Sequence, residues 1–236
     1  MIAFLRSEED LEKLGNLVDH DEDSRDVLIM LASYDIPVYI LNRKTEYHRL
    51  WAKYNLGLLG IEEESGLPCS LLDLLAQIDN PDTTDALFAW QVPPGEPAQI
   101  YSWDATRYAA IIRALEDSKT TSDLDLATSL LSRGVSLDEL VRSLLNSVQQ
   151  CLLHLHPESS QFNQTLVFPL VMAASQRNHL SCDAKDFICS TMQSLAMEGN
   201  YHLRQGILKI IQEHWANDDD TIEETARRLD LEVAMW

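Results

Sequence analysis

Cysteine and basic side chains are scarce in this sequence, and the shortage of basic side chains excludes a class of function. The 236 residues include four cysteines, and 18 Lys and Arg side chains stand against 38 Asp and Glu, which gives a formal net charge of −20. A surface that binds nucleic acid must neutralise phosphates with clustered basic residues, and no run of five basic residues occurs. We therefore expect no direct nucleic-acid binding by this chain, whereas an acidic surface suits basic partners.

Long apolar runs and the short motifs of catalytic sites are also missing. No apolar run approaches the ~20 residues that cross a bilayer, and the start, MIAFLRSEEDLEK, lacks the basic residues and apolar core of a signal peptide. The patterns GxxxxGK, GxSxG and HExxH are absent. The composition, 45% apolar and 24% charged, is typical of a globular protein. We expect a soluble intracellular protein that is not an enzyme.

The stretch from Thr165 to Trp215 organises the chain. Residues 166–174 are apolar on every side at helical spacing, which predicts a buried helix, with Pro169 in its first turn. Two amphipathic helices follow. Their apolar faces are Ala184, Phe187, Ile188, Thr191, Met192 and Leu195 in the first, and Leu203, Ile207, Ile210, Ile211, His214 and Trp215 in the second. We predict an all-α protein of about ten helices, packed as a single irregular domain around a buried helix near residues 165–177.

Local signals place further helix boundaries. Ser136 and Glu139 form the pattern of a capping box, which predicts the start of a long helix that ends before Pro157. The run VPPGEP predicts a loop, because three prolines and a glycine cannot continue a helix, and a helix is expected over residues 103–116.

Charge divides the chain into three parts. They are an acidic N-terminal segment (1–26), a helical domain (27–217) and an acidic C-terminal helix or tail (218–236). The first part is interpreted as a solvated helix and loop, with an acidic activating segment as the alternative. In the last part, Asp220 is expected to cap a short final helix.

Four stretches resemble one protein family. They are FPLVMAASQRN with a later helix that ends at Trp215, GLPCSLLDLLAQI at residues 66–78, residues 87–94 with Trp90 before a double proline, and a helix that carries Tyr108 and Ala109. Together they resemble fungal-specific transcription factor effector domains, in the subgroup that includes sterol-responsive regulators. In that family an all-helical regulatory region lies C-terminal to a zinc-cluster DNA-binding domain. The polar segment RALEDSKTTSD departs from the longer apolar run of the family.

The resemblance implies a nuclear domain, with shuttling to the cytoplasm left open, that controls transcription through protein partners or self-association. It also implies a small apolar ligand bound among the C-terminal helices. A zinc cluster needs six closely spaced cysteines. Cys69, Cys151, Cys182 and Cys189 are too dispersed to form one and are interpreted as reduced core thiols. We therefore expect an effector domain without its DNA-binding module, either excised from a longer protein or a stand-alone relative.

Two alternatives stay open. The first is a stand-alone helical co-regulator or oligomerisation scaffold. The second is a magnesium-dependent prenyl-type enzyme, suggested by the carboxylates of Asp219, Asp220 and Glu223 in a DDxxE pattern. Only thirteen residues follow Glu223, which leaves no room for a second metal-binding motif well downstream.

The remaining candidate groups favour structural roles. His154 and His156 diverge by about 200° on a helix, so they cannot share a metal ion. Cys182 and Cys189 lie seven residues apart, with only His179 as an additional ligand nearby. Asp35 beside Tyr34 is interpreted as hydrogen-bonded at a helix kink next to Pro37. We therefore expect no catalytic, cofactor-binding or metal-binding residue, and no cofactor.

Five apolar side chains in the C-terminal part of the chain are candidates to line a ligand cavity. They are Phe168, Met172, Phe187, Met192 and Met197. Methionine adapts to irregular shapes and could line a lipophilic cavity, although core packing is favoured for each. The sequence does not identify which residues would contact a ligand.

Overall fold

The computed structural model describes residues 25–32, 36, 50–54, 58–63, 65–117, 130, 133–155, 165–197, 201–217 and 220–231. Within these ranges every regular element is a helix, and an isolated antiparallel bridge joins Ile61 to Pro68. The predicted all-α fold is confirmed. No helix in this part of the chain has both the length and the apolar character needed to cross a membrane.

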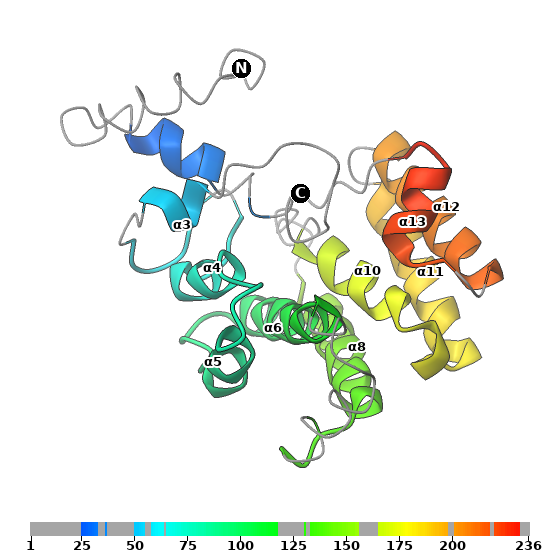
Figure 1. The fold of residues 1–236 in the computed structure, drawn as a ribbon, viewed down its shortest axis with the longest axis horizontal. Helices are drawn as coiled ribbons and strands as arrows, with labels where there is room; N and C mark the ends of the chain where they lie inside the picture. Colours follow the sequence, from blue (N-terminus) through cyan, green and yellow to red (C-terminus); the bar gives the residue numbers. More distant parts are fainter. Residues whose placement is uncertain are drawn as a thin grey trace.

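The helices form three groups along the molecule (Figure 1). The first group contains α3 (Leu50–Tyr54), α4 (Cys69–Leu75) and α5 (Thr83–Ala89). Residues 25–32, which precede this group in the chain, are also helical. The central group contains α6 (Pro97–Asp117), α8 (Leu137–His154) and α10 (Val167–Ser175). The last group contains the 3₁₀ turn η3 (Arg177–His179), α11 (Cys182–Met197), α12 (Tyr201–Ala216) and α13 (Ile222–Arg228).

Helix α10 is the buried helix that the sequence predicts. Every residue from 167 to 174 is buried, and the helix packs against α6, α8, α11 and α12. Its apolar character on all sides explains this position, because a helix with no polar face must be covered on every side. Pro169 lies in the first turn, where its missing N–H breaks no helical hydrogen bond.

Helix α6 connects the first group to the centre. The helix packs against α5, α8 and α10. Its buried residues include the small side chains of Ala105, Ala109 and Ala110. The indole of Trp103 donates from Nε1 to the carbonyl of Gly66 at 2.8 Å. The helix begins at Pro97, so the predicted start at residue 103 is six residues late. The rigid φ of proline suits the first helical position, where its missing N–H is not needed.

The helix caps confirm one prediction and correct another. The Ser136 hydroxyl accepts from the Glu139 amide at 3.2 Å, and the Glu139 carboxylate accepts from the Ser136 amide at 2.8 Å, so the predicted capping box opens α8. The predicted cap of α13 is wrong. Thr221, not Asp220, is the N-cap, because its extended backbone aims its hydroxyl at the amide of Glu224.

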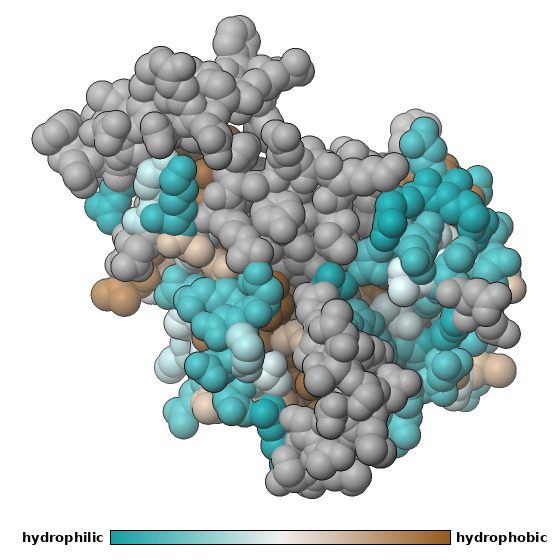
Figure 2. Space-filling view, in the orientation of Figure 1, coloured by the Kyte–Doolittle hydropathy of each residue, from teal (hydrophilic) through white to brown (hydrophobic). Residues whose placement is uncertain are grey.

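The amphipathic faces of α11 and α12 agree with the sequence pattern. Their buried residues include Ile188, Thr191, Met192, Leu195, Ile207, Ile210, Ile211 and His214. Helix α13 packs on α12 and buries Ile222 and Ala226 in the same hydrophobic core, and Thr225 is buried beside them on this helix. On the face drawn in Figure 2, the surface over the last group of helices is mainly hydrophilic.

Candidate functional site

The C-terminal end of α10 is held by side chains from the end of α12. A helix leaves its last carbonyls without partners inside the helix, and here the buried position of α10 limits their access to water. Trp215 donates from Nε1 to the carbonyl of Ala174 at 2.9 Å, and His214 Nε2 lies 3.3 Å from the carbonyl of Ser175. The last turn of α12 therefore completes the last turn of α10.

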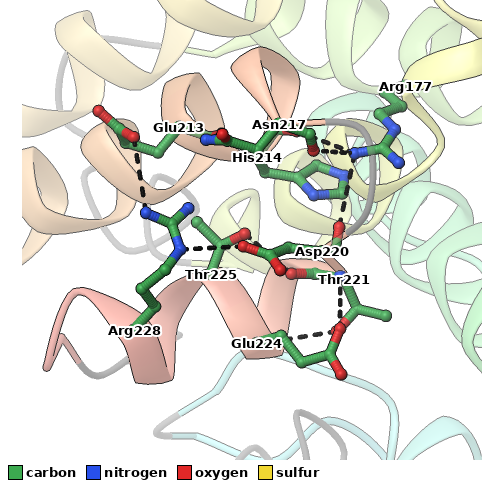
Figure 3. Close-up of polar contacts among 9 residues, drawn as sticks. All are labelled: Arg177, Glu213, His214, Asn217, Asp220, Thr221, Glu224, Thr225 and Arg228. Carbon is green, nitrogen blue, oxygen red and sulfur yellow. Dashed lines mark hydrogen bonds and ion pairs between the residues drawn. The ribbon is translucent and has the colours of Figure 1, made fainter.

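Arg177 makes the reciprocal connection, from the end of α10 back to α12 and α13 (Figure 3). Its Nη1 donates to the carbonyls of His214 at 3.0 Å, Asn217 at 2.5 Å and Asp220 at 3.5 Å. A positive charge at the C-terminal end of a helix is favourable, because the helix dipole is negative there. One guanidinium thus fixes the end of α12 and the turn that leads into α13.

A buried ion-pair network joins α6 to α10 and α13. The side chain of Arg113 is 7% exposed, and its Nη1 lies 2.7 Å from Glu223 and 3.7 Å from Glu116. Glu116 also accepts from the Ser175 hydroxyl at 2.9 Å and from the side-chain amide of Gln176. Buried charges persist only where they are paired and hydrogen-bonded, so this network fixes how the three helices meet.

These groups surround a cavity of about 560 Å³ between the ends of α6, α10, α12 and α13. We call it the junction pocket. It is lined by charged and polar side chains, among them Arg113, Glu116, Arg177, His214, Asp220, Glu223, Glu224 and Arg227. Both signs of charge are present, which distinguishes the cavity from an apolar ligand site.

His214 is the buried titratable group of the junction pocket. Its residue is 3% exposed, and its Nδ1 is buried without a hydrogen-bond partner. Burial lowers the pKa of His214 below its ordinary value, and the positive charge of Arg177 lowers it further. The carbonyls of Ser175 and Asp220 and the Glu223 carboxylate oppose this lowering of the pKa. The imidazole is therefore held in its neutral form near pH 7.

The carboxylates of the DDxxE pattern are engaged with arginine. Asp220 accepts from Arg228 Nε at 2.9 Å (Figure 3), and Glu223 is paired with Arg113. Asp219 lies outside the described residues. Within the described ranges, no group of three or more His, Cys, Asp or Glu residues is placed to hold a metal ion. The geometry gives the prenyl-type enzyme no support.

The other histidine candidates are separate from this pocket or paired. His154 is exposed and stacks on the ring of Tyr101, with the ring centroids 5.7 Å apart. His179 Nδ1 lies 2.7 Å from the carboxylate of Asp138. The second histidine of the pair, His156, and the Tyr34-Asp35 pair lie outside the described residues.

The four cysteines are free thiols in different surroundings. Cys69 and Cys151 are buried, and burial raises the pKa of the Cys151 thiol to about 12. Cys189 is half-buried. The prediction of a core thiol is wrong for Cys182, which is exposed because it begins α11 at the surface.

The candidate cavity-lining residues are mostly core residues. Phe168, Met172 and Met192 are fully buried within the hydrophobic core, and none of the three lines the junction pocket. Phe187 is half-buried and lines a surface groove of about 570 Å³ between α8 and α11. The side chain of Met197 lies outside the described residues.

One signal in the sequence indicates that polar contacts surround the end of α10. The polar triplet Gln176-Arg177-Asn178 directly follows an apolar run that is buried on all sides. Polar residues at the end of such a helix must serve its unsatisfied carbonyls or neighbouring backbone. The sequence does not indicate the partners, because the backbone carbonyls that accept from Arg177 lie 37 to 43 residues further along the chain.

The fold and the junction define an all-helical domain in which buried polar side chains connect helix ends. A family model described as a fungal specific transcription factor domain matches residues 55–231, which is 177 of the 236 residues. The chain belongs to this family, as the four sequence stretches predicted. A search of curated proteins and a search of solved structures each returned no match.

Proposed function

We propose that this chain is a regulatory domain that controls transcription through protein partners and does not contact DNA itself. Membership of the fungal-specific transcription factor family carries the first half of the proposal. The charge carries the second half, because a net charge of −20 repels a phosphate backbone. A place of action in the nucleus follows from the same family membership.

The distribution of charge strengthens the argument. Residues 54–106, which include α4, α5 and the start of α6, contain nine Asp and Glu residues and no Lys, Arg or His. A surface of one sign steers partners of the opposite sign and raises their association rate. A basic protein segment is therefore the kind of partner that this part of the molecule favours.

The sterol-responsive subgroup and a small apolar ligand stay predictions. Phe168, Met172 and Met192 already fill the core, so their packing does not support a lipophilic cavity among them. A stoichiometric lipid that copurifies with the protein would support the prediction.

The test of the main proposal is a reporter assay. The chain is fused to a heterologous DNA-binding module, and the module alone is the control. We expect the fusion to change reporter output in either direction, and we expect the isolated chain to leave a DNA duplex unshifted at physiological salt. A fusion that behaves like the module alone, together with a chain that binds DNA, would contradict the proposal.

A second candidate function, self-association as a scaffold, is favoured by an exposed apolar side chain of α8. Leu153, near the C-terminal end of this helix, is 69% exposed. Sedimentation velocity tests this candidate with Leu153→Asp. The matched control is Leu59→Asp, since Leu59 is 94% exposed on a loop. An assembly that dissociates only with the first substitution would support the scaffold, and a monomeric wild type would contradict it.

A further inference from the structure

The surface groove between α8 and α11 is long and narrowly defined on its α8 side. Helix α10 packs against both α8 and α11 (Figure 1). The lining residues of α8 are one turn apart or adjacent on a single helical face, and they are Asp138, Val141, Arg142, Leu145, Asn146 and Gln149. The eleven residues from Asp138 to Gln149 correspond to about 16 Å along a helix axis. The groove is therefore long enough for about three turns of another helix.

Apolar side chains from both helices border this groove. Val141 is buried, whereas Leu145, Ala184 and Phe187 are half-buried. Leu145 and Phe187 pack against the hydrophobic core and also line the groove. Neighbouring apolar groups that stay partly exposed between polar residues are typical of a protein contact site. The groove therefore suits a partner that brings apolar side chains of its own.

Exposed acidic side chains surround these apolar residues. Asp138 and Asp183 line the groove, and Glu139 and Asp186 are exposed on the same two helices. Arg142 is the basic lining residue of α8, and it attracts the carboxylate of Glu139, which lies one turn earlier. The charges of Arg142 and Glu139 therefore offset each other.

Two further basic groups leave the α11 side of the groove acidic. His179 Nδ1 lies 2.7 Å from the carboxylate of Asp138. The Lys185 ammonium lies 5.4 Å from the ring centroid of Trp215, which does not line the groove. Among the described residues, Asp183 has no ion-pair partner. The negative charge that remains on this side attracts a basic segment.

We propose that the groove between α8 and α11 binds an amphipathic helix of a partner protein, with apolar side chains on Leu145 and Phe187 and Lys or Arg side chains towards Asp183. Helices that bind in grooves use apolar residues at positions i, i+3 or i+4 and i+7, which span about 10 Å of helix. The groove is long enough for this spacing. An acidic helix would bring like charge to Asp183, and a polar helix would leave the apolar residues uncovered. The inference concerns binding alone and does not rest on the proposed role in transcription.

The test is a selection of peptides from a display library against the purified full chain. The library presents one helical scaffold whose surface positions vary. Counter-selection uses Phe187→Ser, because this substitution removes the aromatic side chain that lines the groove. The most enriched peptide is then synthesised, and its affinity is measured by fluorescence anisotropy.

Matched variants of the full chain separate the apolar contribution from the charge. Phe187→Ser and Leu145→Ser remove apolar side chains of the groove, and Asp183→Lys reverses an exposed charge at its edge. Leu59→Ser is the control, because Leu59 is 94% exposed and does not line the groove. Far-UV circular dichroism shows which variants fold. If Phe187→Ser fails to fold, Asp183→Lys replaces it in the counter-selection.

We expect the enriched peptides to carry a net positive charge and apolar residues at i, i+3 or i+4 and i+7. Phe187→Ser should weaken the affinity by about tenfold, since it removes a central apolar contact. Asp183→Lys should weaken it by about threefold, and by more at low salt, because the effect is electrostatic. Leu59→Ser should leave the affinity unchanged.

Several outcomes would overturn the proposal. They are no enrichment beyond the counter-selection, enriched peptides with a net negative charge, and an affinity that Asp183→Lys does not change. Sedimentation velocity without peptide tests a different occupant. If the wild type dimerises and Phe187→Ser is a folded monomer, the groove binds a second copy of this chain and the proposal is wrong.

Discussion

Arg177→Gln is the perturbation that best tests how the junction stabilises the fold. The substitution removes a charged donor from the carbonyls of His214, Asn217 and Asp220, of which two lie within 3.0 Å. A hydrogen bond to a charged group contributes about 1.5–3 kcal/mol, and a cation at a helix C-terminus about 0.3–1 kcal/mol. Arg177 is half-buried, so water replaces part of the loss. We expect a decrease of about 2–3 kcal/mol in the free energy of unfolding.

Urea unfolding followed by far-UV circular dichroism measures this loss. At about 2–4 °C per kcal/mol for a chain of this size, the unfolding temperature should fall by about 4–12 °C. Arg177→Lys keeps the charge but not the planar guanidinium and should lose less. Arg142→Gln, at an exposed position of α8, should stay within about 0.5 kcal/mol of the wild type.

The opposite result would refute the reasoning. If Arg177→Gln is as stable as Arg142→Gln, the three carbonyls find equivalent partners in water, and the contacts of Arg177 do not stabilise the meeting of α10, α12 and α13. If Arg177→Lys loses as much as Arg177→Gln, the geometry of the guanidinium matters and its charge does not.

Three further substitutions test other parts of the structure. Burial lowers the pKa of His214 in the folded state. The contribution of His214 to folding stability is therefore complete above the unfolded pKa of ~6.5 and is lost as pH falls through the folded pKa. Urea midpoints at pH 7 and pH 5 should show that acid destabilises the wild type more than His214→Gln. Phe168→Ala empties a fully buried site and should cost about 3–5 kcal/mol by scanning calorimetry, and a loss below 1 kcal/mol would show that the core collapses around the cavity. Thr221→Ala removes the α13 cap and should cost about 1 kcal/mol in urea, whereas Thr221→Ser should retain most of it.

The elements that the sequence predicted best are those decided by neighbours in the chain. The burial of α10 follows from nine consecutive apolar residues, and the start of α8 follows from the Ser136 and Glu139 pair. Both signals lie within one or two helical turns of the feature that they predict. The wrong N-cap of α13 is also a local matter, since Asp220 and Thr221 are adjacent and either side chain could cap the helix. Only the backbone conformation shows that the Thr221 hydroxyl faces the amide of Glu224.

The partners within the junction could not be predicted, because no sequence pattern identifies them. Arg113 and Glu223 are 110 residues apart, and each has other charged residues nearer in the chain. Arg177 binds backbone carbonyls, which every residue possesses, so no side-chain pattern identifies its partners. The exposure of Cys182 was also not predictable from the sequence pattern, since it depends on the residue at which α11 begins.

The connection between the FPLVMAASQRN stretch and the later tryptophan has a physical reason. A helix that is buried along its whole length brings its C-terminal carbonyls into the protein interior, where each unsatisfied group is costly. Trp215 and His214 donate hydrogen bonds to two of those carbonyls. In the opposite direction, Arg177 donates to backbone carbonyls at the end of α12 and in the turn that follows it. The two segments are thus one structural unit, in which each helix end completes the hydrogen bonds of the other. A domain with a buried helix of this kind needs a polar residue after it and a long donor side chain from the helix that covers its end.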